Sequence, residues 1–272
     1  MAGNIKCSGK RSRHAAELRA RLCGDILGQA NNGKLACSSR IGRVLDVIDV
    51  VFPCLDEATA LPWVLDRLPA GYRAIVVDNG SRDASAQIAA DRGATVVTEP
   101  RRGFGSAAHA GLAAAQADWV AFCDCDASMD PAQLPRLVEP MLVGTAELVL
   151  GRRKPTSWRS WPLHARLANK VLAWRLRQLT GVSVHDLGPM RVASRQALLD
   201  LDVRDRRSGY PLEMFLKAAR AGWRIAELPI DYTPRSGASK VTGTLKGTWH
   251  AIADMSALLS DARGAAVQST VR

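Results

Sequence analysis

Two carboxylates separated by a single residue, Asp124-Cys125-Asp126, are the feature of this sequence with the clearest chemical meaning. They follow the apolar segment 118–123, which we expect to be a strand, so both side chains would lie at the mouth of that strand. Carboxylate oxygens at this spacing can bind one hard divalent cation, Mg²⁺ or Mn²⁺, and such ions commonly bridge to substrate phosphates. The alternative is turn chemistry, which is the role we expect for Asp130, a helix cap before Pro131. We favour the metal site for Asp124 and Asp126.

Charged and polar residues follow the other predicted strands as well. They form four groups: Pro53-Cys54-Leu55-Asp56-Glu57, Asp78-Asn79-Gly80-Ser81-Arg82-Asp83, Glu99-Pro100-Arg101-Arg102-Gly103 and Gly151-Arg152-Arg153. Turns favour Asp, Asn, Gly and Ser for conformational reasons, so any one group could be scaffold. In open α/β sheets, however, ligands bind beyond the carboxyl ends of the strands. Because several of the predicted strands are followed by carboxylates, the sequence predicts a binding site along one edge of a sheet.

A regular alternation of elements would place these residues along one edge. Strands are expected at 46–52 (ended by Pro53), 73–78, 94–98, 118–123 and 147–151, with helices at 58–68, 84–92, 106–116 and 131–142. This alternation indicates βαβ units on a parallel sheet. A helical pattern then runs to Gly181, followed by a loop at 185–191, a helix at 212–221, a strand at 223–229 and a last helix at 245–260. The fold class is therefore α/β, a mostly parallel sheet flanked by helices in a single domain.

Charge divides the chain into unequal parts. Residues 1–45 hold nine Lys and Arg against two acidic residues, which is most of the net charge of +11 on 272 residues. We expect a basic, weakly ordered leader at 1–45, a domain at 46–260 and a flexible tail at 261–272. No stacking-aromatic motif or recognition helix accompanies the basic residues, so no nucleic-acid partner is expected. Loose contact of the leader with anionic lipid or nucleic acid remains an alternative to a solvated tail.

The expected location is cytoplasmic. No apolar run reaches the roughly 18 residues of a membrane span, and the first residues lack the apolar region of a secretory signal. All six cysteines lie in the first half without a CxxC pair, which favours buried thiols in a reducing compartment. The helix at 245–260 could touch the inner face of a membrane, although packing on the sheet is an equally good interpretation.

The segment 103–108 also matches a dinucleotide-binding pattern, G-x-G-x-x-[GA]. Those glycines should directly follow the first strand, whereas here two strand–helix units precede them. We therefore expect Gly103 and Gly105 either to open a helix whose N-terminus faces an anionic group, or to permit close packing of that helix.

Taken in order, these motifs resemble those of family 2 glycosyltransferases with the GT-A fold, and most closely the dolichyl- or polyprenyl-phosphate sugar synthases. The resemblance covers about 46–245. It lies in Pro53…Glu57 (P-x-x-N-E, with Asp56 in place of Asn), Asp78-Asn79-Gly80-Ser81-x-Asp83, Glu99…Gly103, Asp124-x-Asp126, Gly151-Arg152-Arg153 and Glu213…Pro229…Arg235…Gly237-Ala238-Ser239-Lys240. The fold that this resemblance implies is a GT-A type, Rossmann-like sheet.

The resemblance also implies roles for individual residues. Nucleotide-sugar binding would fall to Pro53, Glu57, Asp78, Asp83, Gly103, Asp124 and Arg152; metal binding to Asp124 and Asp126; phosphate binding to Arg191, Arg235, Ser239 and Lys240; and catalysis to Asp126, Glu213 and Asp186. Ser128 stands where the lipid-phosphate enzymes often have Gln, which leaves the third protein ligand of the metal open. A phosphate acceptor needs positioning more than deprotonation, whereas a hydroxyl acceptor needs a base, for which Glu213 and Asp186 are the candidates.

The predicted function is a metal-dependent, inverting transfer of a sugar from a nucleoside-diphosphate sugar, with UDP favoured, to a polyprenyl-phosphate-type acceptor. Alternatives are a soluble small-molecule or glycan acceptor, and a sugar-nucleotide-binding protein without catalysis. A sugar nucleotidyltransferase would need a Gly-rich loop after the first strand, which 53–57 lacks. An NAD-dependent oxidoreductase would rest on 103–108 alone. The sugar, the nucleoside, the acceptor and the oligomeric state stay open.

Overall fold

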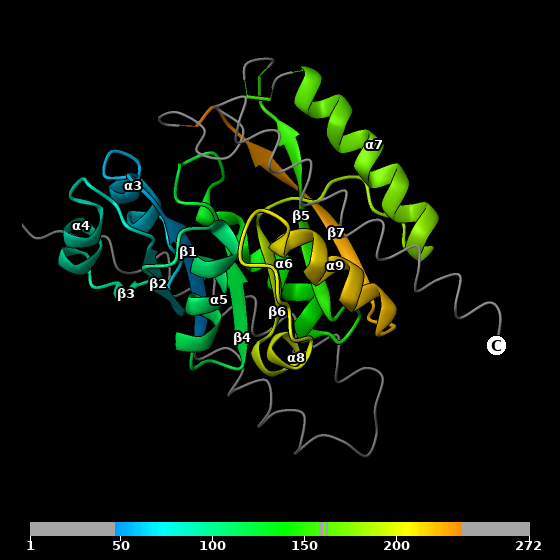
Figure 1. The fold of residues 1–272 in the computed structure, drawn as a ribbon, viewed down its shortest axis with the longest axis horizontal. Helices are drawn as coiled ribbons and strands as arrows, with labels where there is room; N and C mark the ends of the chain where they lie inside the picture. Colours follow the sequence, from blue (N-terminus) through cyan, green and yellow to red (C-terminus); the bar gives the residue numbers. More distant parts are fainter. Residues whose placement is uncertain (1–46, 158–159, 162, 236–272) are drawn as a thin grey trace, which may run out of the picture. The chain divides into compact units, whose positions relative to one another are not determined.

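The computed structural model describes residues 47–157, 160–161 and 163–235 (Figure 1). Contacts divide the chain into two units, 1–46 and 47–272, and every described residue belongs to the second. The expected leader at 1–45, the helix at 245–260, the tail at 261–272 and the predicted phosphate ligands Ser239 and Lys240 therefore lie outside the described residues.

A seven-stranded sheet runs through the described part of the chain, in the order β3-β2-β1-β4-β6-β5-β7. Its strands are β1 (Ile48–Cys54), β2 (Tyr72–Asp78), β3 (Thr95–Thr98), β4 (Trp119–Phe122), β5 (Leu148–Pro155), β6 (Arg191–Ser194) and β7 (Ile225–Tyr232). The first four strands pair in parallel, β7 pairs in parallel with β5, and β6 is antiparallel to both of its neighbours. This confirms the mostly parallel α/β sheet predicted from the sequence.

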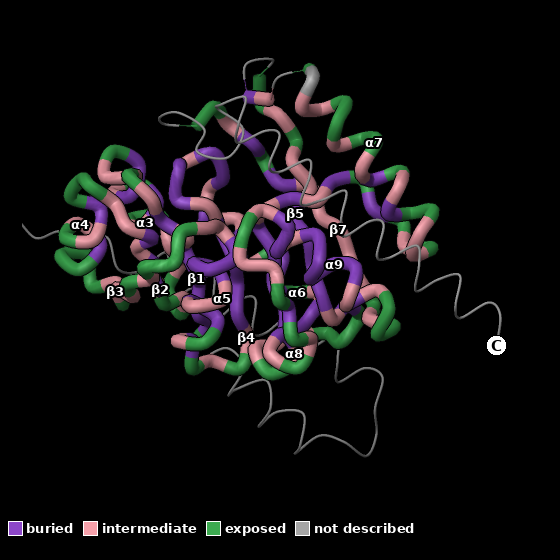
Figure 2. Tube along the Cα trace, in the orientation of Figure 1, coloured by how far each residue is buried: buried purple, intermediate pink, exposed green. Residues whose placement is uncertain are grey.

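Helices cover both faces of the sheet, because successive strand residues point to opposite sides. On one face Val51 packs in a core cluster with residues of α5 (Phe104–Ala114), α7 (Leu163–Thr180), α8 (Arg195–Asp200) and α9 (Tyr210–Arg220). On the other face Val50 and Phe52 pack with residues of α3 (Leu61–Asp66), α4 (Ser85–Asp91) and α6 (Leu134–Leu142). Figure 2 shows the buried residues concentrated in the strands between these layers. Asp130 accepts a hydrogen bond from the Ala132 N–H at the start of the 3-10 turn Pro131–Gln133, which confirms the predicted cap.

The structure differs from the predicted elements in three places. Pro53 lies inside β1 rather than ending it. A proline has no N–H to donate, but none is needed here, because β4 pairs only with Asp49–Val51 and leaves Pro53 without a β4 partner. β5 continues past Gly151 to Pro155, since it pairs with β7 along its whole length, so Arg152 and Arg153 lie within a strand. The short elements β6 and α8 were not predicted, because four and six residues are too few for a clear periodic pattern.

One buried carboxylate joins β1 to its surroundings. Asp49 is fully buried and accepts hydrogen bonds from the Arg73 guanidinium, at 2.7 and 3.0 Å, and from the N–H groups of Gln116 and Ala117, at 2.6 and 2.8 Å. Burial by itself would raise the pKa of Asp49, but these hydrogen bonds outweigh it, so the pKa is lowered. The ionised carboxylate therefore stabilises the fold, and this contribution is lost as the pH falls below the unfolded value of 3.8.

Replacing Asp49 with Asn is expected to lower the free energy of unfolding by about 2–4 kcal/mol, because an amide cannot accept from all of these donors. Urea denaturation at pH 7 measures the loss, and the difference from the wild type should shrink below about pH 4, where Asp49 of the unfolded chain becomes protonated while the folded carboxylate, with its lowered pKa, is still ionised. Asp66→Asn is the matched control, since the Asp66 side chain is 68% exposed. Equal denaturation midpoints for Asp49→Asn and Asp66→Asn would contradict this interpretation.

Candidate active site

The carboxyl ends of the neighbouring strands β1, β2 and β4 meet at one edge of the sheet. The Asn79 N–H donates to the Cys54 carbonyl at 2.9 Å, and the Cys125 thiol donates to the Pro53 carbonyl at 3.1 Å. These contacts bring the residues after β4, including Asp124 and Asp126, beside the end of β1. The predicted clustering of strand-end residues is therefore present.

Asp124 and Asp126 interact electrostatically at this edge. Burial, with the Asp126 charge as the next cause, raises the pKa of Asp124 to about 7. Arg235, Arg153 and Arg191 act in the opposite direction. The Asp126 carboxylate accepts from the Ser128 N–H at 3.0 Å and lies 3.5 Å from the Arg235 guanidinium. Two acidic groups thus lie in a partly dehydrated place surrounded by arginines.

This arrangement fits a divalent cation. Burial and the neighbouring Asp126 charge disfavour the ionised form of Asp124, which a bound cation would stabilise, and carboxylate oxygens are ligands that Mg²⁺ and Mn²⁺ prefer. The Ser128 hydroxyl is buried and has no hydrogen-bond partner within the described part of the chain, so another oxygen near Asp126 is available. The described residues contain no group of three His, Cys, Asp or Glu that could hold a metal. Asp124 and Asp126 would therefore share the cation with non-protein ligands, as expected for a metal that bridges to a phosphate.

The loops after β1 and β2 are tied together by side chains. The Asp83 carboxylate accepts from the N–H groups of Ala58 and Ser85, both at 3.0 Å, and the Ser85 hydroxyl accepts from the Glu57 N–H at 2.9 Å. Asp78 accepts from the Ser81 N–H at 3.0 Å and so shapes the start of its own loop. The predicted nucleotide-binding residues Pro53 and Asp78 thus lie at the carboxyl ends of β1 and β2, and Glu57 and Asp83 on the two adjoining loops that follow. Their binding role stays a prediction.

Asn79 has a structural role that the sequence analysis missed. Its amide nitrogen donates to the carbonyls of Glu99 and Arg101, both at 2.8 Å, and its amide oxygen accepts from the Gly103 N–H at 2.8 Å. The buried Asn79 side chain therefore fixes the loop after β3 against the loop after β2. Its place in the Asp78…Asp83 motif was visible in the sequence, but its partners 20 or more residues away were not.

Gly103 and Gly105 permit close packing. The N–H groups of Gly105 and Ser106, in the first turn of α5, donate to the carbonyls of Arg207 and Arg206 at 2.8 and 2.9 Å. A Cβ at Gly103, where φ is +144°, would lie 2.2 Å from the Arg206 carbonyl oxygen. Of the two expectations for these glycines, the structure supports close packing. Nucleotide binding by Gly103 stays a prediction; its N–H donates to the Asn79 amide oxygen, and its Cα lies against the backbone of Arg206.

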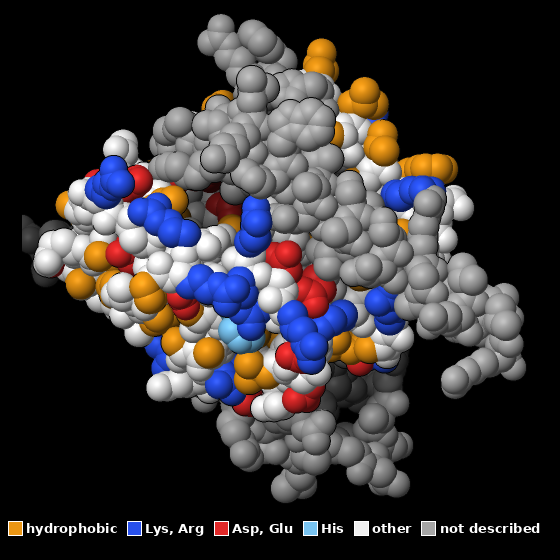
Figure 3. All heavy atoms as spheres, viewed as in Figure 1, with side chains coloured by type: hydrophobic (Ala, Val, Ile, Leu, Met, Phe, Trp, Pro, Cys, Tyr) orange, Lys and Arg blue, Asp and Glu red, His pale blue; other side chains and the backbone are white. Residues whose placement is uncertain are grey.

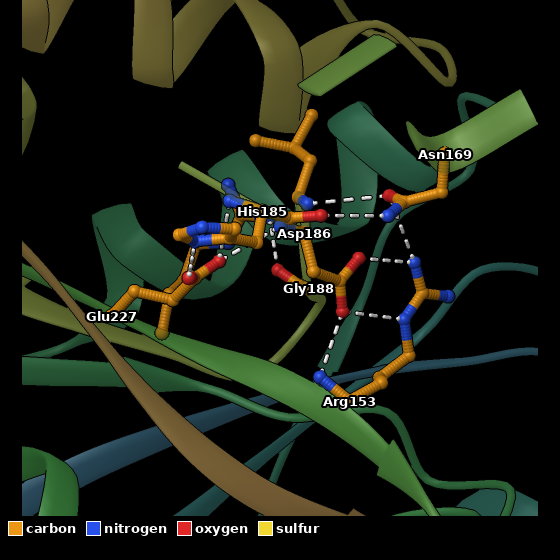
Figure 4. A network of polar contacts seen from close by, with 8 residues as sticks. Arg153, Asn169, His185, Asp186, Gly188 and Glu227 are labelled. Atoms are coloured by element: carbon orange, nitrogen blue, oxygen red, sulfur yellow. Dashed lines mark hydrogen bonds and ion pairs between the residues drawn. The ribbon is translucent and has the colours of Figure 1, made fainter. Parts of the chain in front are cut away.

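A second polar network lies between β5, α7 and the loop before β6 (Figure 4). The Arg153 guanidinium forms a two-pronged ion pair with Asp186, at 2.9 and 2.6 Å, and the Arg153 N–H donates to the same carboxylate at 2.8 Å. The Arg153 guanidinium also lies 4.1 Å from the Trp161 ring centroid. Asn169 of α7 donates to the His185 carbonyl at 3.0 Å. The network thus orients Arg153 and leaves Asp186 almost completely buried.

Glu227 of β7 completes this network. Its carboxylate accepts from the N–H groups of His185 and Asp186, at 3.0 and 2.7 Å, and lies 2.8 Å from the His185 ring nitrogen Nδ1. Arg152 lies 3.9 Å from the same carboxylate. Nothing in the sequence marked Glu227, because its partners lie about 40 residues earlier in the chain.

Two predicted residues, Arg191 and Glu213, have contacts that the sequence did not reveal. The Arg191 guanidinium is buried, which lowers its pKa to about 10, and it donates to the carbonyls of Gly188 and Pro211 at 2.5 and 3.1 Å. The Glu213 carboxylate accepts from the N–H groups of Arg204 and Asp205 and pairs with Lys217 at 3.0 Å. Burial would raise the pKa of Glu213, but these bonds outweigh it and lower the pKa.

These contacts bear on the candidate bases. The carboxylates of Glu213 and Asp186 both hold backbone and cationic partners, and a lowered pKa makes Glu213 a weak base. Their roles as bases stay predictions, whereas the structure gives each a positioning role. Glu213 fixes the turn at Arg204 and Asp205 through their N–H groups. The carbonyls of Arg206 and Arg207, which follow this turn, accept hydrogen bonds from the first turn of α5.

Comparison with known proteins agrees with this geometry. Residues 49–201 match the model of glycosyl transferase family 2. An uncharacterized glycosyltransferase of Mycobacterium tuberculosis is 54% identical over 216 residues, which cover 79% of this chain and 99% of that protein. A dolichyl-phosphate hexose transferase of Haloferax volcanii is 30% identical over 200 residues, covering 72% of this chain and 87% of that protein.

Solved structures are also similar. Glucosyl-3-phosphoglycerate synthase from Mycobacterium tuberculosis, in complex with Mn²⁺, UDP and glucosyl-3-phosphoglycerate, has a TM-score of 0.63 and 25% sequence identity. The match covers 81% of this chain and 84% of that chain. The same enzyme in complex with Mg²⁺ and UDP has a TM-score of 0.64. With its GT-A fold and a family match over more than half of its residues, this chain belongs to glycosyltransferase family 2.

Proposed function

We propose that this enzyme transfers a sugar from a UDP-sugar to the phosphate of a polyprenyl-phosphate acceptor, with a divalent cation and with inversion at the anomeric carbon. The observation that carries the proposal is the pair of interacting carboxylates Asp124 and Asp126, surrounded by Arg153, Arg191 and Arg235. A structural neighbour binds UDP with Mn²⁺, and a distant relative is a dolichyl-phosphate hexose transferase. These likenesses support the UDP donor and the lipid-phosphate acceptor.

Each group of residues has a part in this reaction. Asp124 and Asp126 would hold the cation, which when bound neutralises the charge that grows on the departing diphosphate. The ends of β1 and β2 and the loops after them, with Pro53, Glu57, Asp78 and Asp83, would bind the nucleotide sugar together with Arg152 of β5. Arg191, Arg235 and Lys240 would supply positive charge for phosphates of donor and acceptor, and the Ser239 hydroxyl could donate a hydrogen bond to them. Arg191 would act from beneath the site, since its guanidinium is buried.

The bond changes balance without a catalytic base. An oxygen of the acceptor phosphate forms the new bond to the anomeric carbon, on the face opposite the diphosphate. The bond from that carbon to the diphosphate oxygen breaks, and its electron pair leaves with UDP. An acceptor phosphate is already anionic at pH 7, so positioning by the arginines matters more than removal of a proton. Asp186 then contributes by holding Arg153 in place.

A product assay tests the proposal. The full chain is incubated with Mn²⁺ and radiolabelled UDP-, GDP- or ADP-sugars, together with either undecaprenyl phosphate in detergent or 3-phosphoglycerate. We expect UDP release that depends on undecaprenyl phosphate, with label passing into the organic phase. Label found only in a water-soluble product with 3-phosphoglycerate would overturn the acceptor. If the chain binds a nucleotide sugar but releases no nucleotide with either acceptor, the proposal that it is a catalyst would be wrong.

A further inference from the structure

The outward face of α7 carries an exposed apolar stripe. The exposed fractions are 80% for Leu163, 64% for Leu167, 56% for Val171 and 52% for Trp174. Four of the seven exposed large hydrophobic residues among the described residues lie on this one helix. Their spacing places them within roughly 80° of the helix circumference at 3.6 residues per turn. Figure 3 shows a row of hydrophobic side chains along the edge of the view that α7 occupies in Figure 1.

The fold does not need this stripe in order to hold α7. The opposite face of the helix packs into the core through Leu172, Ala173, Leu176 and Leu179. An amphipathic helix that is already anchored by one apolar face normally presents polar residues on the other. A contiguous exposed apolar row therefore indicates a binding surface.

The charges beside the stripe indicate what it binds. The helix carries Arg166, Lys170, Arg175 and Arg177 and no acidic residue between 163 and 180. By their spacing, Arg166, Lys170 and Arg177 flank the stripe on one side and Arg175 flanks it on the other. No described carboxylate forms an ion pair with any of these four. Apolar residues that include a Trp, bordered by basic residues, are typical of helices that lie in a membrane interface.

We propose that this face of α7 docks on the surface of a bilayer that contains anionic lipid. Lipid phosphates would neutralise the basic residues while the apolar side chains enter the boundary between head groups and acyl chains. A second copy of the chain fits less well, because pairing two such helices would bring four cations against four without a carboxylate. The segment 236–272 is also net basic, with four Lys and Arg against two Asp, so it offers no charge complement.

The same helix contacts the network at the candidate site. The Asn169 amide oxygen lies 3.5 Å from the Arg153 guanidinium nitrogen and 3.4 Å from the Leu187 N–H, which donates to it. Figure 4 shows Asn169 beside Arg153 and Asp186. Docking through α7 would therefore bring a lipid-borne phosphate to the side of the site where Arg153 lies. That consequence rests on the proposed function, whereas the docking itself does not.

Sedimentation with vesicles tests the docking. The full chain is mixed with vesicles of phosphatidylcholine alone, or of phosphatidylcholine with one third phosphatidylglycerol. We expect binding to the anionic vesicles that weakens as salt is added. The variant Leu167→Ser with Trp174→Ser should bind at least about ten-fold more weakly, because burial of each side chain is worth well over a ten-fold change in affinity. Trp63→Ser is the matched control, since Trp63 is 41% exposed on α3, and it should bind as the wild type does.

Two results would overturn the docking. One is equal binding by the wild type and the Leu167→Ser, Trp174→Ser variant, or no binding by either. The other is a wild type that is dimeric and a variant that is monomeric, with neither protein binding to vesicles. Binding of UDP with Mn²⁺, measured without lipid, separates this test from the proposed function. A wild type that binds vesicles but not UDP contradicts the proposed function alone, and the variant is expected to keep UDP binding.

Discussion

Replacing Asp126 with Asn is expected to lower the rate of sugar transfer by about a thousand-fold or more. The substitution removes one charge from the carboxylate pair that, in the proposed function, would hold the divalent cation and so neutralise the leaving diphosphate. Lewis-acid stabilisation of this kind is worth several kcal/mol in the transition state, and each 1.36 kcal/mol is a factor of ten in rate. UDP release in the presence of undecaprenyl phosphate measures the effect. Circular dichroism checks that the variant is folded.

Asp130→Asn is the control for this experiment. Asp130 lies four residues further along the same segment, but it caps a helical turn and forms an ion pair with Arg67. Its substitution should leave the transfer rate within about three-fold of the wild type while lowering stability by at most about 1 kcal/mol, because Asn also caps a helix and only the ion pair with Arg67 is lost. A transfer rate for Asp126→Asn within ten-fold of the wild type would show that the carboxylate pair does not hold an essential metal.

Replacing Asp186 with Ala is expected to lower the free energy of unfolding by about 3–5 kcal/mol, because it leaves the Arg153 guanidinium buried without its counter-charge. The side chain of Asp186 is 2% exposed and that of Arg153 is 19% exposed. The same substitution also removes the acceptor of the Arg153 N–H. Guanidinium denaturation of the two proteins measures the loss.

A double variant separates this positioning role from a catalytic one. Arg153→Met with Asp186→Leu removes both charges, so it should recover much of the stability lost in Asp186→Ala while transfer stays impaired. Asp202→Asn removes the charge of the exposed pair with Arg204 and should leave the denaturation midpoint unchanged, since Asn tolerates the left-handed backbone of this position as Asp does. If Asp186→Ala were as stable as the wild type and only the turnover rate fell, Asp186 would be a base rather than a support for Arg153.

Most of the sheet could be predicted from the sequence, because the expected strands at 46–52, 73–78, 94–98, 118–123, 147–151 and 223–229 overlap six of the seven observed strands. β1, β2 and β4 are short runs of apolar, mostly β-branched or aromatic residues separated by helices, and the order of such runs fixes a parallel arrangement with all carboxyl ends at one edge. The carboxylate pair was predictable for the same reason, since Asp124 and Asp126 are neighbours in the sequence. Residues that come directly after a strand can be identified without knowledge of the tertiary structure.

The strand β6 and the full length of β5 depend on contacts that are distant in sequence. β6 is only four residues long and is defined by its antiparallel pairing with both β4 and β5, so its sequence alone shows no strand pattern. β5 is extended past Gly151 by β7, more than 70 residues later. The ion pair of Arg153 with Asp186 joins residues 33 positions apart, and this explains why Asp186 looked like a candidate base. The sequence could not predict that the Asp186 carboxylate accepts hydrogen bonds from Arg153, because this contact forms only in the folded chain.

The measurement that tests the central claim most directly is a calorimetric titration of the full chain with UDP, once with Mn²⁺ and once with EDTA. If Asp124 and Asp126 bind a divalent cation against the diphosphate, UDP affinity should fall by at least about ten-fold when the metal is removed, and Asp126→Asn should bind equally with and without Mn²⁺. Equal UDP affinity in Mn²⁺ and EDTA for the wild type would contradict the account, as would a wild type that binds no UDP.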